Sequence, residues 1–140
     1  MRSRRGAQAA LSILFIAALS IGAIAAAAPH TFYGDFPFFA HWVKLLPPYN
    51  QHLTTDVGGL YLGFAVVFAW AATTLQPTLV RAACAGWLLT QTLHVAFHAT
   101  HLDGFDAADA IGEIVSLALL LLPAAAAIWA VSEPPADATA

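Results

Sequence analysis

Charged residues are scarce in this sequence: five Lys and Arg and eight Asp and Glu make up 9% of its 140 residues. Soluble domains carry about 25% charged residues, which form a hydrated surface. A formal net charge of -3, with no basic patch beyond the arginines at positions 2 to 5, also excludes nucleic acid as a partner. The sequence therefore predicts a protein whose surface is solvated largely by lipid.

Cysteine is almost absent, since Cys84 is the single residue of its kind. An intrachain disulfide is excluded, and a cluster of thiolate ligands would need other chains. We interpret Cys84 as a small apolar side chain inside a helix. The Gly-rich phosphate loop and the Gly-x-Ser-x-Gly nucleophile motif are missing too. Nucleophilic catalysis has no support, while a metal-dependent lipid hydrolase and an oxidoreductase both stay open.

Long apolar stretches are the main feature of the chain, in which 60% of residues are hydrophobic. A helix needs about 20 apolar residues to cross the hydrocarbon core of a bilayer. Four stretches have that length, and their Ala and Leu content favours helix over strand. The sequence predicts an all-α integral membrane protein, one four-helix bundle over residues 1–131, with transmembrane helices at about 8–28, 53–75, 78–99 and 107–131.

The first stretch has a second interpretation. Three arginines precede an apolar run that ends in the alanines 25 to 28, a pattern also typical of a cleaved secretory signal peptide. The run of about 20 apolar residues exceeds the 7 to 15 usual for a signal core, which favours a retained helix. Cleavage would leave three helices.

Basic residues predict the orientation. Arg81, near the turn between the second and third helices, lies on the same side as the N-terminal arginines, whereas the other side carries only Lys44. The positive-inside rule then predicts a multi-pass plasma-membrane protein with both termini in the cytoplasm. The tail 132–140, with two prolines and two acidic residues, is predicted to be disordered.

The outer segment 29–52 is rich in aromatic residues, which suit the headgroup region of a membrane. We interpret Phe38 to Leu46 as a short amphipathic helix on the membrane surface, ended by Pro47 and Pro48. Lys44 would extend from it to water or phosphate. His30 and His41 are interpreted as ordinary interfacial residues.

All six histidines fall in the outer half of this topology, with most of the carboxylates. Three helix ends repeat a four-residue spacing, which places both residues on one helix face; the pairs are His52 and Asp56, His94 and His98, and Asp109 and Glu113. Two imidazoles one turn apart can bind one metal ion. We predict a site for one divalent transition metal ion (zinc, copper, iron or manganese) or a small ligand, with the candidate residues His94, His98, Glu113, Asp56 and His52.

Other interpretations of the same residues stay open. They are a polar cluster that locks the helix ends together, a proton-transfer network, and a site for a quinone or a haem. His101 would either cap the third helix together with His98 or complete a ligand set with His94 and His98.

Helical spacing also predicts which faces point inward. One polar stripe joins Gln91, His94 and His98 with Cys84 and Trp87, and a second joins Asp56 with Gly59 and Gly63. A Gly-xxx-Gly pair lets a neighbouring helix approach closely. The Gly59/Gly63 face would also allow a homo-oligomer or a larger membrane complex, so the alternative function is a non-catalytic accessory or scaffold subunit.

The stretch from Leu46 to Gly59 reads Leu-Pro-Pro-Tyr-Asn-Gln-His-Leu-Thr-Thr-Asp-Val-Gly-Gly. It resembles a motif of small uncharacterised actinobacterial integral membrane proteins, which look like the DoxX-like group of four-helix proteins. The resemblance covers this motif and the topology. It implies a four-helix bundle in the plasma membrane, with Asn50, His52 and Asp56 as motif positions, and it implies no activity.

Overall fold

The computed structural model describes residues 2–46 and 48–132, and this part of the chain forms helices and no strand. The all-α prediction is confirmed, and each of the apolar stretches is helical. The predicted tail lies outside the described residues from residue 133 onward. In chain order the elements are α1 (Arg2–Ala27), α2 (Pro29–Asp35), the 3-10 helix η1 (Trp42–Leu45), α3 (Gln51–Thr74), α4 (Pro77–Ala99), α5 (Ala107–Leu119) and α6 (Leu121–Ala130).

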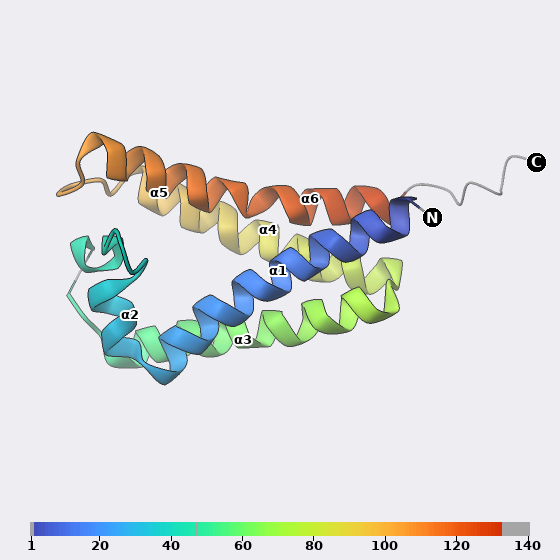
Figure 1. The fold of residues 1–140 in the computed structure, drawn as a ribbon, viewed down its shortest axis with the longest axis horizontal. Coiled ribbons are helices and arrows are strands. Elements are labelled where there is room, and N and C mark those ends of the chain that lie inside the picture. Colours follow the sequence, from blue (N-terminus) through green and yellow to red (C-terminus); the bar gives the residue numbers. More distant parts are fainter. Residues whose placement is uncertain (1, 47, 133–140) are drawn as a thin grey trace, which may run out of the picture.

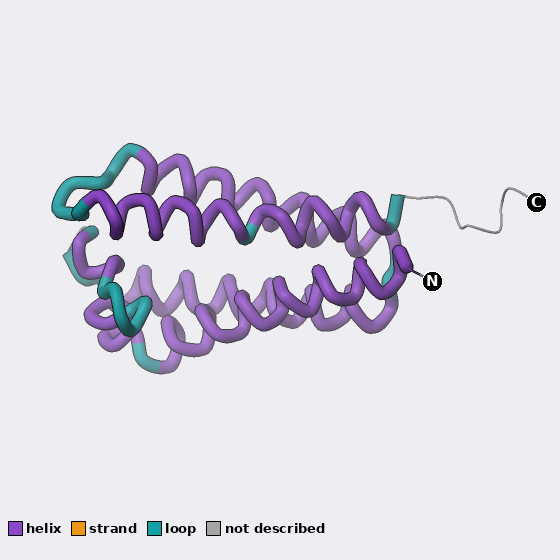
Figure 2. Tube along the Cα trace, turned by 45° about the horizontal axis from the view of Figure 1, so that its top comes forward, coloured by secondary structure: helices purple, strands orange, loops and turns teal. Residues whose placement is uncertain are grey.

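The long helices lie side by side in two pairs, as Figures 1 and 2 show. α1 packs along α3, while α4 packs along the rod that α5 and α6 form together. The start of α1, the α3–α4 connection and the end of α6 lie at one end of the molecule. The other end carries α2, η1 and the α4–α5 connection (Figure 1), and we call it the outer end.

Three helical segments are long and apolar enough to cross a membrane: Arg4–Ala27, Gln51–Thr74 and Ala107–Ala130, the last of which joins α5 and α6. Large hydrophobic side chains such as Ile16, Val66 and Trp129 are exposed on these segments, as lipid contact requires. α4 corresponds to the predicted third span, 78–99, and has a similar length, but it is not among these three segments. The polar residues Gln91, His94 and His98 on one face of α4 lower its mean hydropathy.

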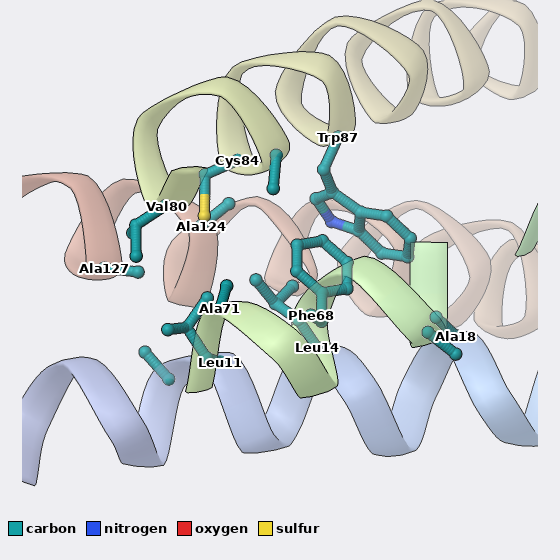
Figure 3. Close-up of a cluster of buried hydrophobic side chains, with 13 residues drawn as sticks. Leu11, Leu14, Ala18, Phe68, Ala71, Val80, Cys84, Trp87, Ala124 and Ala127 are labelled. Atoms are coloured by element: carbon teal, nitrogen blue, oxygen red, sulfur yellow. The ribbon is translucent and has the colours of Figure 1, made fainter. Parts of the chain in front are cut away.

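The hydrophobic core lies in the half of the molecule opposite the outer end, and Figure 3 shows its side chains meeting between the helices. Leu14, Phe68 and Trp87 are completely buried there, and the rings of Phe68 and Trp87 meet edge to face with centroids 5.3 Å apart. Cys84 is buried beside them, which confirms its interpretation as an apolar filler. Lipid tails are as apolar as these side chains, so this packing stabilises the fold through van der Waals contact.

A proline explains why α5 and α6 are separate helices. Pro123 has no N–H, so it cannot donate the usual helical hydrogen bond to the carbonyl four residues earlier. The break falls at Leu120, whose carbonyl accepts a hydrogen bond of 3.0 Å from Trp87 Nε1 of α4. The indole therefore ties α4 to the joint.

Two glycines allow α1 and α3 to approach closely. A Cβ atom at Gly58 would lie 2.4 Å from the backbone nitrogen of Ala26, and one at Gly22 would lie 2.8 Å from that of Leu62. Glycine is thus required at both positions. The prediction that Gly59 and Gly63 face inward is wrong: both are exposed, with open space where a side chain would stand. The close contact lies one residue earlier, on a different face of α3.

The outer segment also differs from its prediction. Helix forms at Pro29–Asp35, where Pro29 occupies a first-turn position and needs no N–H partner. It ends at Phe36, whose extended backbone is the conformation favoured before a proline such as Pro37. The predicted helix from Phe38 to Leu46 is reduced to η1, because His41 adopts a left-handed conformation with φ of 60°.

Candidate functional site

A cavity of about 670 Å³ lies at the outer end of the molecule, within the range of small-molecule pockets. Every helix except α6 contributes to its wall, and most of the lining side chains are aromatic or aliphatic. The apolar part of the wall consists of Ile21, Phe32, Tyr33, Phe36, Pro37, Phe39, Trp42, Val43, Leu46, Pro48, Leu53, Val57, Tyr61, Phe97, Leu117 and Leu120.

The central polar feature of the wall is a pair formed by α4 and α5. His98 Nδ1 lies 2.8 Å from Glu113 Oε1, and the two residues are only 5% and 3% exposed. Even so, neither His98 Nδ1 nor Glu113 Oε2 has a hydrogen-bond partner by angle and distance within the described residues. A buried polar group without a partner is costly, which makes this pair the strongest candidate for contact with a ligand.

Local structure explains how the pair forms. Asp106 is the N-cap of α5, and its side chain accepts a hydrogen bond of 2.8 Å from the Asp109 backbone N–H, as capping residues do. Gly104, with φ of 90°, lets the chain turn between α4 and α5. Glu113 then falls two turns into α5, opposite the last turn of α4 that carries His98.

The other two histidines of α4 differ in role. His94 lines the cavity, and its ring centroid is 4.5 Å from that of His98. His101 stacks on Phe97 at 4.0 Å, and its Nδ1 lies 2.8 Å from the Phe97 carbonyl oxygen. His101 therefore sits at the end of α4 as a cap, whereas His98, its predicted partner in that role, pairs with Glu113.

The predicted residues of α3 stand apart from this pair. His52 Nε2 lies 3.3 Å from Asp56 Oδ2, but both side chains are largely exposed, and neither lines the cavity. His30 packs against Tyr49, and His41 lies 3.8 Å from Asp35. Of the five predicted site residues, the structure brings His94, His98 and Glu113 together at the cavity and leaves His52 and Asp56 outside it.

Metal coordination needs a closer arrangement. Three or four ligands normally surround a zinc ion. Across residues 2–46 and 48–132, no three His, Cys, Asp or Glu side chains converge in a way that could hold a metal ion. His94, His98 and Glu113 would have to rearrange to do so.

Trp42 is a site residue that the sequence interpretation missed. Its indole ring lies over Gly112 of α5, where a Cβ atom would be 3.2 Å from the ring. The indole Nε1 is buried and lacks a hydrogen-bond partner among the described residues. In the sequence, the signal for this contact was the glycine Gly112 directly before Glu113. Spacing along the chain could not relate Gly112 to Trp42, which lies 70 positions earlier.

A second polar contact involves Tyr61, which lines the cavity. Gln91 of α4 is buried and donates a hydrogen bond of 2.9 Å from Nε2 to the hydroxyl of Tyr61 on α3. The predicted inward stripe of α4 is confirmed at Cys84, Trp87, Gln91 and His98, all of which are buried.

Comparisons of the chain with protein-family models, with curated proteins and with solved structures give no match.

Proposed function

We propose that this protein is a four-helix bundle in the plasma membrane, with α1 retained as the first span and α4 as the third. The packing of α4 against both α3 and the α5–α6 rod supports its place among the spans, because its polar stripe is covered by protein. Both termini of the chain, next to the start of α1 and the end of α6, would face the cytoplasm, and the cavity would open near the outer leaflet. Membership of the DoxX-like group stays a prediction.

We infer that the bundle binds a small, largely apolar molecule in the outer cavity. One observation carries this proposal: the buried His98–Glu113 pair, with hydrogen-bonding capacity left over, stands in the wall of an apolar cavity of about 670 Å³. Apolar walls with a few placed polar groups are typical of ligand sites. An ionisable pair inside a membrane protein usually marks a functional site.

A small organic ligand fits this geometry better than a metal ion does. The aromatic wall offers contact area to an apolar molecule, whereas an ion would need His94, His98 and Glu113 to converge. His52 and Asp56 would have to move from the exposed surface of α3 to take part. Binding of zinc, copper, iron or manganese remains the second prediction for the same residues.

The test combines two measurements on one preparation. Protein extracted into lipid nanodiscs is examined by native mass spectrometry for bound organic molecules and by elemental analysis after metal repletion. The variants are His94→Ala/His98→Ala and, as a matched control, His52→Ala on the exposed pair. An organic molecule at about one per chain, lost in the α4 variant alone, supports the proposal. One metal ion per chain that is lost in that variant would replace the proposal with the metal site. If the protein binds neither an organic molecule nor a metal ion, both proposals are overturned.

A separate observation supports the alternative function as an accessory subunit. Gly59 and Gly63 lie on an exposed face of α3, and nothing stands where their side chains would be. Small residues on a lipid-exposed face allow another helix to pack closely. If this function is correct, Gly59→Leu/Gly63→Leu will release a co-purifying partner, while His98 and Glu113 variants will keep it.

A further inference from the structure

The polar groups of the outer cavity restrict the chemistry of its ligand, and this inference rests on the proposed binding function. Three polar side chains in the wall already have partners. Asn50 Oδ1 accepts a hydrogen bond of 3.1 Å from the Leu53 N–H. The Thr54 hydroxyl donates to the Asn50 carbonyl at 2.9 Å, and the Ser116 hydroxyl donates to the Glu113 carbonyl at 2.9 Å. These oxygen atoms are therefore already hydrogen-bonded within the protein.

Three buried atoms of the wall have no hydrogen-bond partner among the described residues: Trp42 Nε1, His98 Nδ1 and Glu113 Oε2. His98 Nδ1 faces Glu113 Oε1 at 2.8 Å, so Trp42 Nε1 and Glu113 Oε2 are the two that remain for a ligand. They belong to neighbouring parts of the wall, because the indole ring of Trp42 rests on Gly112, the residue before Glu113. An indole nitrogen donates a hydrogen bond and cannot accept one, whereas a carboxylate oxygen accepts. The cavity wall therefore presents one fixed donor and one acceptor, the donor on a ring that packs on Gly112 and the acceptor on the next residue of α5.

We infer that the ligand is an uncharged amphiphile whose polar end is a hydroxyl group. A hydroxyl oxygen accepts from the Trp42 N–H while its proton is donated to Glu113 Oε2, so one group satisfies both atoms. A carboxylate would place a negative charge opposite Glu113. An ammonium group has no acceptor to offer Trp42, and a hydrocarbon end leaves both atoms unpaired. The aromatic and aliphatic wall takes the apolar body of the molecule.

The test uses photoactivatable probes that share one alkyl diazirine chain and differ at the end: hydroxyl, carboxylate, ammonium or methyl. Each probe is titrated into the protein in nanodiscs, and the labelled residues are identified by peptide mass spectrometry. The hydroxyl probe is expected to label residues of the cavity wall at about tenfold lower concentration than the methyl probe, as one good hydrogen-bonded site implies.

Matched variants assign the preference to the indole. Trp42→Phe keeps an aromatic side chain and removes the donor, so the preference for the hydroxyl probe over the methyl probe should fall about fivefold, the size of one hydrogen bond. Labelling of the wall by the methyl probe shows that the cavity is still formed. Trp70→Phe, at an exposed position of α3, should change neither probe.

The outcomes separate the ligand class from the binding function. Cavity labelling with no preference for the hydroxyl end, or with preference for a charged end, overturns the hydroxyl assignment and leaves the proposed function standing. Labelling of lipid-facing residues by every probe, with none in the cavity wall, overturns both.

Discussion

His98 Nδ1 and Glu113 Oε1 are 2.8 Å apart at a place where both side chains are almost completely removed from solvent. The pair joins the end of α4 to the second turn of α5 and stands in the wall of the outer cavity. A buried ionisable pair adds little stability compared with apolar residues of the same size, but loss of one partner leaves the other uncompensated. This asymmetry gives the first prediction.

Single substitution of the pair should destabilise the protein more than double substitution. His98→Leu or Glu113→Leu should each lower the free energy of unfolding in detergent by about 2 to 4 kcal/mol, because a buried polar group is left alone. His98→Leu/Glu113→Leu should recover most of that loss. The measurement is a double-mutant cycle by chemical unfolding, with Asp56→Leu as an exposed control. Additive effects of the two single changes would mean that the residues do not interact.

The two adjacent glycines of α3 should respond in opposite ways. Gly58→Ala drives a Cβ into the backbone of α1 at Ala26, so the midpoint of thermal unfolding should fall markedly. Gly59→Ala meets open space and gains up to about 1 kcal/mol of helix propensity, so its midpoint should stay or rise. Equal damage from both changes would indicate a partner bound at Gly59, in agreement with the accessory-subunit function.

Cysteine labelling should reveal the orientation, since Cys84 is buried and is the only native cysteine. Asp103→Cys, in the α4–α5 connection, should react in intact cells with a thiol reagent that cannot cross the membrane. Gln76→Cys, in the α3–α4 connection, should react only after the cells are permeabilised. The unsubstituted protein provides the background. The reverse pattern would invert the proposed topology.

The mature protein should keep α1. Leu11, Leu14, Ala18 and Ala25 of this helix are completely buried, and Gly22 fits against α3, so removal of the helix would expose a large part of the core. The mass of the intact protein extracted from membranes should therefore include α1. A mass that corresponds to a start near Pro29 would show that residues 1 to 28 act as a signal peptide.

Sequence patterns located the helices well. The predicted second and third helices, 53–75 and 78–99, differ from α3 and α4 by at most two residues at either end, because the length of an apolar stretch and its flanking prolines fix where a helix runs. The four-residue spacings also selected His94, His98 and Glu113, which line one cavity.

The rotation of each helix about its axis was harder to predict. Asp56 and Gly59 were placed inward by their spacing, yet α3 turns Gly58 toward α1 and leaves His52 and Asp56 exposed. The choice between adjacent faces depends on which neighbour packs there, and an apolar helix in lipid has little polarity difference around its circumference to indicate it. The contact of Trp42 with Gly112 is likewise long-range in sequence and depends on the path of the outer segment.

The close fit of Gly22 and Gly58 has a mechanical consequence. α1 and α3 are held backbone to backbone and should move as one rigid body, while Trp87 fastens α4 to the joint at Leu120 and makes a second rigid body. The core opposite the outer end lies between the two bodies. A small change in the angle between them would widen or narrow the outer end, so the size of the cavity would depend on residues that do not line it.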